Sequence, residues 1–460
     1  MFELGRELMR LLGGERVRPH ADGLTGGDTT LLELLDLNLL QQEAKAADVA
    51  AGRISAHDRA QRRLDAAMVW REVARRSDDA VALRKAACAA ETACAAFDPT
   101  RRPDAWARAR CEQAFCAMLG AEMFGDEGLH AAAEVAFREA RAAARGGLAA
   151  ALAEVGVAAV EARLRLADGD AQAARVACAR FSAPIVALEA QMRRHTIARQ
   201  LAAEARIVRA DILSAWGAKL KDADLLRDAV EEAARAARGL DPAYEPLTWA
   251  RAEILRGQAM VLQGETSGEV GVVADGVSAL ADVLDHLNRD HSPFDWARVQ
   301  AALGQGLQAL GDASANEQAY EQAVTCYDRA ALVLKDAPTS PLRGLAAGAR
   351  ALCLIRSAEL TGDLGVLDAA EAAMKIELAR APGRRDPVGW ALSQIHLARL
   401  YEARLDMTGR DRGERASAVT ALDAALDVFA EHGLRSLSMV AVDALERLKA
   451  GPRRLPPTER

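Results

Sequence analysis

In three places in this sequence an arginine follows a tryptophan by two residues: Arg108, Arg251 and Arg298. A guanidinium group binds a carboxylate through two parallel hydrogen bonds, and its fixed fork of donors also suits the carbonyl groups of an extended peptide. These arginines could therefore recognise acidic groups or a peptide main chain. The alternative is structural, because each arginine could instead form an ion pair with an acidic residue of the neighbouring segment.

Residues that could support catalysis or hold a metal are dispersed. Carboxylates are plentiful, but on alanine-rich helices they are usually solvated or paired with an arginine one turn away. His195 and His396 fall within predicted helices, and we interpret both as structural. The seven cysteines form no C-x2-C pair and are interpreted as buried thiols in a reducing compartment: Cys88, Cys94, Cys111, Cys116, Cys178, Cys326 and Cys353.

Sequence motifs of the common enzyme classes are missing from the chain. It contains no G-x-x-x-x-G-K-[ST], no G-x-S-x-G and no H-E-x-x-H. Gly304, Gly306 and Ala309 spell the loose form G-x-G-x-x-A, but they lie inside a predicted helix that no strand precedes. We therefore expect no catalytic residues, no cofactor and no metal site.

The segments that carry the arginines repeat along the chain. Pro-x-x-Trp followed by Ala occurs four times, with its tryptophans at Trp106, Trp249, Trp296 and Trp390. A fifth copy, from Pro341 to Gly344, keeps the proline and lacks the tryptophan. Successive copies from 249 onward are 47, 48 and 46 residues apart, and the first gap of 143 residues is close to three periods. The same step predicts unmarked repeats near Arg59, Ala153 and Leu201.

Each repeat has the pattern of two helices. In the best copy, Trp296, Leu303 and Leu307 recur at helical spacing, and the helix is expected to end at Gly311. A second helix carries Ala323, Tyr327 and Ala330, where small residues allow close packing. Neither helix can bury its apolar face alone, so neighbouring repeats must cover it.

Residues 296–311, WARVQAALGQGLQALG, resemble the tetratricopeptide repeat, and most closely its long bacterial variant with W-A-x-x-Q-x-x-L-G-x-x-L-x-x-L-G. The repeat is about 47 residues long here, against 34 in the usual form. The resemblance implies an all-α, right-handed solenoid of about eight helix pairs. It also implies that certain positions of the first helices face a concave groove: Arg108, Phe115, Met118, Arg251, Gln258, Arg298, Gln305, Gln308, Arg356, Arg399 and Glu402.

We predict four segments from breaks in this pattern. Residues 1–28 form an amphipathic helix and a tether, 29–240 a divergent helical array, 241–450 a regular array with a capping helix, and 451–460 a disordered tail. Within the divergent part, residues 31–51 and 185–216 are each predicted to form one helix, the second unusually long.

The amphipathic helix at the start of the chain carries apolar residues on one face: Phe2, Leu4, Leu8, Leu11 and Leu12. A helix of about a dozen residues is marginal alone in water, so it must dock on something. Three docking places remain open, namely the first repeat of its own chain, another protein, or a membrane surface.

Composition excludes several classes of protein. The net charge of −7 is spread along the chain, whereas a nucleic-acid binder would show a clustered basic face. The sequence has no run of about 18 apolar residues that would predict a membrane-spanning helix, and its first residues do not have the pattern of a secretory signal. We therefore expect a cytoplasmic protein, and its association with itself stays open.

Two functions are compatible with the sequence. The first is a non-enzymatic scaffold or adaptor that binds a partner peptide or helix in its concave groove. The second is a regulatory sensor that holds a small ligand in the solenoid, with the N-terminal helix as a switch. An open trough would favour the first, and an enclosed pocket of about 300–1,000 Å³ the second.

Overall fold

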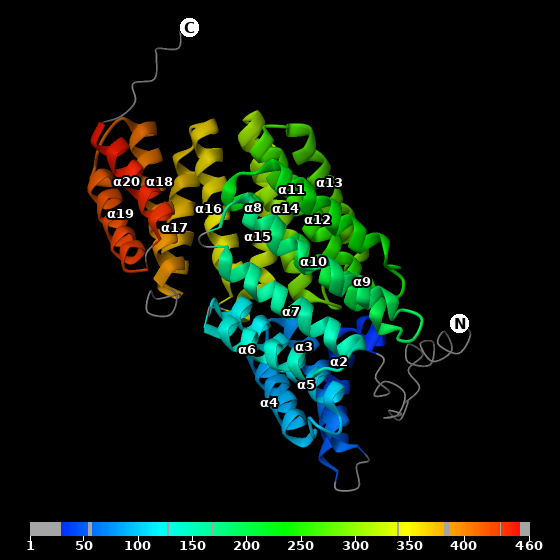
Figure 1. Ribbon diagram of the computed structural model, residues 1–460. Coiled ribbons are helices and arrows are strands. Elements are labelled where there is room, and N and C mark those ends of the chain that lie inside the picture. Colours follow the sequence, from blue (N-terminus) through cyan, green and yellow to red (C-terminus); the bar gives the residue numbers. More distant parts are fainter. Residues whose placement is uncertain are drawn as a thin grey trace.

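The computed structural model describes residues 29–53, 58–126, 128–166, 169–337, 340–380, 387–432 and 434–450. Within these ranges every regular element is a helix, and successive helices pack as antiparallel pairs (Figure 1). The expected all-α solenoid of helix pairs is confirmed. The predicted amphipathic helix in residues 1–28 and the predicted tail 451–460 lie outside the described residues.

The described chain contains eight helix pairs in succession, followed by a final helix. The first helices of the pairs are α3 (Arg59–Ser77), α5 (Pro103–Phe124), α7 (Gly147–Arg165), α10 (Ile197–Leu220), α12 (Pro246–Ser267), α14 (Pro293–Ser314), α16 (Pro341–Thr361) and α18 (Pro387–Thr408). The second helices are α4 (Ala80–Ala96), α6 (Gly128–Ala143), α8 (Ala171–Ala179) with α9 (Ser182–Ala190), α11 (Ala223–Arg238), α13 (Val270–His286), α15 (Glu317–Val333), α17 (Leu364–Arg380) and α19 (Glu414–Glu431). The remaining elements are the 3-10 turns η1 (Thr29–Leu34) and η2 (Leu334–Asp336), α2 (Leu37–Gly52) and the last helix, α20 (Arg435–Ala450).

Proline and a left-handed residue mark the two ends of most first helices. Proline is the first residue of α5, α12, α14, α16 and α18, where its missing N–H is not needed. At the other end the backbone turns through positive φ, which glycine adopts most easily. The last four of these turns lie 47 residues apart: Gly268 (φ 77°), Ala315 (φ 50°), Gly362 (φ 74°) and Gly409 (φ 61°).

The repeat without a tryptophan is displaced by one residue from the expected alignment. Trp249 and Trp296 each precede the left-handed residue of their helix by 19 positions, and in α16 the residue 19 positions before Gly362 is Arg343. Alignment on the proline had placed Gly344 there. The shift arises because α16 spans 21 residues from its proline, whereas α12 and α14 span 22.

Small residues of the first helices face large residues of the second. A Cβ on Gly304 would lie 2.9 Å from the Tyr327 ring, and one on Gly257 would lie 2.6 Å from Leu280. Trp296 is half-buried against an apolar cluster formed mainly by the preceding pair, α12 and α13. Close packing within and between pairs therefore follows the sequence pattern.

The predicted long helix over residues 185–216 is wrong. The chain forms turns between Gln191 and Thr196, so α9 ends at Ala190 and α10 begins at Ile197. Two short helices, α8 and α9, take the place of one second helix and pack against both α7 and α10. The predicted helix 31–51 is also divided, because the Asp36 side chain caps α2 by accepting a hydrogen bond from the Leu39 N–H at 2.8 Å.

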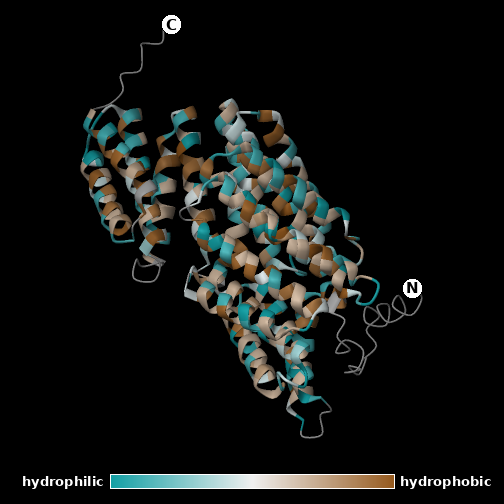
Figure 2. Cartoon of the chain, in the orientation of Figure 1, coloured by the Kyte–Doolittle hydropathy of each residue, from teal (hydrophilic) through white to brown (hydrophobic). Residues whose placement is uncertain are grey.

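The first helices form one continuous layer that folds back on itself. α10, α12, α14, α16 and α18 pack side by side in that order, and α3 contacts α14 while η1 contacts α10 and α12. The start of the described chain thus lies against segments about 200 residues later. Apolar residues are spread over all helices (Figure 2), and none of the described helices is long and apolar enough to span a membrane.

Candidate functional site

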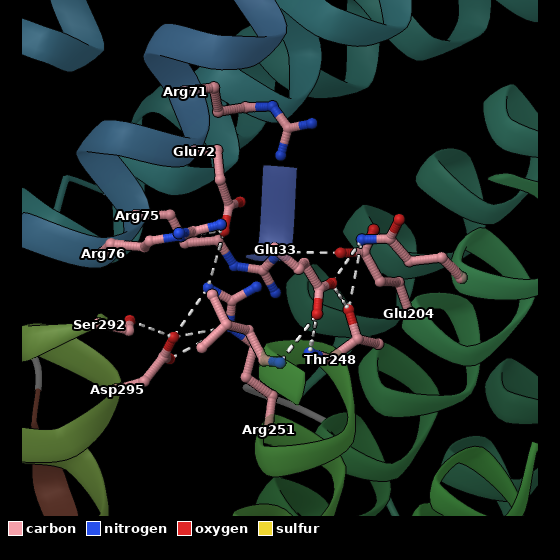
Figure 3. A network of polar contacts seen from close by, with 12 residues as sticks. Glu33, Arg71, Glu72, Arg75, Arg76, Glu204, Thr248, Arg251, Ser292 and Asp295 are labelled. Carbon is pink, nitrogen blue, oxygen red and sulfur yellow. Dashed lines mark hydrogen bonds and ion pairs between the residues drawn. The ribbon is translucent and has the colours of Figure 1, made fainter. Parts of the chain in front are cut away.

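A buried set of ionic side chains lies where η1 and α3 meet α10, α12 and the start of α14 (Figure 3). We call it the inner network, and it comprises Glu33, Arg71, Glu72, Arg75, Arg76, Glu204, Thr248, Arg251, Ser292 and Asp295. Four carboxylates and four guanidinium groups are among its members, and Arg71 pairs with a further carboxylate, that of Glu112, at 2.5 Å. Glu33, Arg76, Arg251 and Asp295 are buried and the other ions are partly exposed. Buried ions persist only when they are paired and hydrogen-bonded.

Glu33 caps the start of α12 from a distant part of the chain. Its carboxylate accepts hydrogen bonds from the N–H groups of Leu247 (2.8 Å) and Thr248 (2.9 Å), and from the Gln200 side chain (2.7 Å). The first N–H groups of a helix have no partner within it, and their dipoles favour an acidic group. Burial raises the pKa of Glu33, although Arg251 and the hydrogen bonds from Thr248 oppose that rise.

Arg251 is held within the network by two carboxylates, and its Nη1 atom is buried without a hydrogen-bond partner among the described residues. Its side chain is 4% exposed, and its Nη2 atom lies 2.8 Å from Asp295 and 3.2 Å from Glu72. Ser292 also donates a hydrogen bond to Asp295 at 2.7 Å. Burial acts to raise the pKa of Asp295, but the charge and hydrogen bonds of Arg251, together with the charges of Arg298 and Arg75, hold that pKa below its usual value. The structural alternative, an ion pair with the neighbouring repeat, therefore describes Arg251.

The two later arginines of the predicted set are paired in the same manner. Arg356 lies 3.7 Å from Asp312 of α14 and 3.2 Å from Glu359, and Arg399 of α18 contacts the same Glu359. Glu402, 3.5 Å from Arg399, continues the series to Arg447 of α20 at 3.1 Å. These residues form a line of alternating charges across four helices, partly exposed to water.

Arg108 and Phe115 line a cavity of about 70 Å³ beside the inner network. Phe115 contacts the Phe137 ring edge-on at 5.2 Å, and the Arg71 guanidinium lies 5.3 Å from the centre of the Phe115 ring. No acidic side chain of the described chain lies within ion-pair distance of Arg108. Met118, in contrast, is buried in the apolar core.

Arg298, Gln258 and Gln305 lie on the adjacent helices α12 and α14 and are half-buried. None of the three forms a hydrogen bond or ion pair with another described residue. Gln308 differs, because it accepts hydrogen bonds from the Tyr327 hydroxyl (3.3 Å) and the Cys353 thiol (3.4 Å). Within the predicted set, Arg251, Gln308, Arg356, Arg399 and Glu402 are thus paired within the fold, whereas Arg108 at the small cavity and the three residues of α12 and α14 are not.

Most of the inner network was not identified from the sequence. Glu33, Glu72 and Asp295 resemble ordinary surface carboxylates in their local sequence, and only their three-dimensional neighbours distinguish them. Asp295 had one signal, since it lies between the repeat proline and tryptophan. Among the described residues, no three His, Cys, Asp or Glu side chains are grouped to hold a metal ion.

No protein-family model and no curated protein matches the chain. Among solved structures, it is similar to a Rap protein complexed with competence and sporulation factor, at 12% sequence identity and a TM-score of 0.44, over 88% of this chain and 98% of that one. It is also similar to a circular tandem repeat protein with novel repeat topology and enhanced subunit contact surfaces, at 17% identity and a TM-score of 0.28, over 92% of this chain and 97% of that one. By its own helix pairs, the chain is a helical repeat protein.

Proposed function

We propose that this protein is a non-enzymatic, cytoplasmic scaffold of the long tetratricopeptide-like type that binds an extended segment of a partner protein along its first helices. The 47-residue spacing of the left-handed turns supports the repeat type. The continuous layer of first helices supplies the surface, since α12, α14, α16 and α18 lie side by side.

The observation that carries the proposal is the unpartnered group formed by Gln258, Arg298 and Gln305. The two glutamines occupy equivalent positions in consecutive repeats, and packed helix axes lie about 8–10 Å apart. Arg298 and Gln305 are two helical turns apart on one face of α14. Each amide offers donors and an acceptor to a peptide main chain, and the guanidinium offers a fork for a carboxylate.

This arrangement gives Arg251 and Arg298 different roles. Arg251 was expected to act together with Arg298 on an acidic or C-terminal segment of the partner, but its guanidinium already serves Asp295 and Glu72. Of these two arginines, Arg298 is therefore the one proposed to bind a carboxylate of the partner. Arg251 contributes by holding α12 and α14 in register.

The experiment begins with affinity capture of partners by the full chain, and by the chain without residues 1–28. The affinity of each captured partner is then measured for Arg298→Ala and for Gln258→Ala combined with Gln305→Ala. Loss of one charge-assisted hydrogen bond, about 1.5–3 kcal/mol, should weaken binding by roughly 10- to 150-fold. The double glutamine variant should also bind more weakly than the parent.

The matched control is Arg227→Ala on the second helix α11, where Arg227 is exposed and, among the described residues, pairs only with Asp224. It should bind the partner as the parent does. If Arg298→Ala and the double glutamine variant also keep the parent affinity while remaining folded, the proposed surface is wrong.

A small-ligand sensor is the second candidate function. It is favoured by a cavity of about 300 Å³ in the C-terminal half, at the lower limit of the range typical of small-molecule sites. The N-terminal helix would then act as the switch or docking element.

A further inference from the structure

The larger cavity lies over α16, between the second helices α15 and α17, and reaches α18. Its volume is about 300 Å³, and its walls include Tyr327 of α15, Ala347 of α16, Met374 of α17 and His396 of α18. Ile376, which is 52% exposed, also lines it, so the cavity opens to the surface beside α17.

The cavity lies in the one repeat of the C-terminal array that has no tryptophan. In α12, Trp249 contacts apolar residues of α11 on one side and the His286 ring of α13 on the other, edge-on at 5.0 Å. It therefore fills the space between two consecutive second helices. The equivalent space in α16 lies between α15 and α17, where the cavity is found.

Arg343 stands at the tryptophan position, lines this space and leaves part of it open. Its guanidinium donates hydrogen bonds to the carbonyl groups of Leu334 (3.1 Å) and Lys335 (3.0 Å) and lies 3.2 Å from Glu377. Further along α16 the cavity is lined by Ala346, Ala347, Gly348 and Ala351, and by Arg350, which pairs with Asp328 of α15 at 2.6 Å. The alanine side chains are too small to replace an indole ring, and the guanidinium of Arg343 is held by its hydrogen bonds and its ion pair.

His396 supplies a polar group at the inner wall. Its ring packs against α16 where there is no side chain, since a Cβ on Gly348 would lie 2.6 Å from the His396 Cε1 atom. The Nδ1 atom is buried and has no hydrogen-bond partner among the described residues. Burial lowers the pKa of His396, so the ring is neutral at pH 7 and can accept one hydrogen bond. A buried polar atom without a partner is costly, so a ligand that pairs with it gains affinity.

We propose that this cavity binds an indole-sized aromatic ring that takes the place held by tryptophan in the neighbouring repeats and donates a hydrogen bond to His396. Tyr327 and Met374 provide the contacts that aromatic rings favour, edge-on ring packing and a thioether sulfur. Two ion pairs also border the cavity, Arg350 with Asp328 (2.6 Å) and Arg343 with Glu377 (3.2 Å), so the ring would pack against the apolar part of the wall. This proposal about the cavity does not depend on the proposed partner-binding surface formed by Gln258, Arg298 and Gln305.

The test is calorimetric titration of the full chain with indole and, separately, with N-acetyl-tryptophanamide. Ala373→Leu places a larger side chain in the cavity wall, and Ala369→Leu, one turn earlier on α17, is an exposed control that does not line it. Indole should bind the parent and the control equally, and Ala373→Leu at least about tenfold more weakly. His396→Phe keeps a ring but loses the acceptor, and should also weaken indole binding about tenfold.

The two probes show whether the aromatic ring belongs to a free small molecule or to a tryptophan side chain of a partner. Binding of both indicates that the mouth admits a peptide backbone, and hence a tryptophan side chain of a partner, whereas binding of indole alone indicates a free small molecule. The proposal is overturned if indole fails to bind the parent up to its solubility limit, or if folded Ala373→Leu and His396→Phe both bind it as the parent does.

Discussion

Arg251 shows how one buried charge fixes the positions of several segments. Its guanidinium touches Glu72 of α3 and Asp295 of α14, and Arg76, buried completely, joins the same Glu72 to the carbonyl groups of Leu32 and Leu35. The Coulomb attraction in such a site mainly repays the cost of removing the ions from water. Loss of one member is therefore more damaging than its single contact suggests, because its partner is left buried and uncompensated.

Replacement of Asp295 by asparagine should reveal this effect. At pH 7 we expect Asp295→Asn to lower the free energy of unfolding by about 3–5 kcal/mol, the usual cost of breaking a buried pair. The pKa of Asp295 in the folded state lies below its ordinary value of 3.8, so its contribution is complete above pH 3.8 and is lost as the pH falls through the folded-state pKa. The difference between variant and parent should consequently shrink on acidification below pH 3.8.

Urea unfolding of both proteins across this pH range checks the expectation. Asp224→Asn on α11 is the control, because Asp224 is exposed and its pair with Arg227 lies at the surface. That change should stay within about 0.5 kcal/mol at every pH. A difference for Asp295→Asn that does not change with pH would contradict the proposed role of the charge.

At the scale of elements, the features that recur in every repeat could be predicted from the sequence, whereas features that occur only once could not. Gly304 opposite Tyr327 could be predicted because helical spacing and residue size are local properties of the chain. The division of residues 185–216 was not predicted, because the mostly polar residues QMRRHT between α9 and α10 include no glycine or proline to mark the end of a helix. The misplaced fifth copy has a similar cause, because proline marks where α16 begins and not which face of the helix is buried.

The two glycines of α13 offer a test of close helix packing. A Cβ on Gly276 would lie 2.9 Å from the backbone carbonyl oxygen of Gly257 and 3.0 Å from the backbone nitrogen of Val261, neither of which can move away alone. Gly276→Ala should therefore destabilise the protein by about 1–3 kcal/mol, despite the better helix propensity of alanine. Gly271→Ala, where the added Cβ would meet nothing within 4 Å, should stabilise it by up to about 1 kcal/mol. Thermal unfolding of the two variants shows whether each substitution stabilises or destabilises the protein. Equal effects on stability would rule out packing as the cause.

At the scale of the whole molecule, the inner network decides how the solenoid closes. Its members from η1 and α3 meet partners in α10 and α12, and the contacts with α12 cross the boundary predicted between residues 240 and 241. Hydrophobic periodicity indicates that a helix has a buried face, but it does not say which distant segment covers that face. Glu33, within the leucine-rich segment TTLLELLDL, could not be matched to the start of α12 from the sequence alone.

Removal of the Glu33 carboxylate should loosen two regions that are far apart in the sequence. In Glu33→Ala the N–H groups of Leu247 and Thr248 lose their acceptor, which should cost about 1–3 kcal/mol of stability. Amide hydrogen exchange should accelerate both in residues 29–52 and in the first turn of α12, because each region holds the other in place. Exchange in α19, which does not contact the network, should remain unchanged, as should all exchange in the control Glu91→Ala on the exposed face of α4. Faster exchange in residues 29–52 with an unaffected α12 would mean that η1 only rests on the solenoid and that closure depends on Arg251 and its partners.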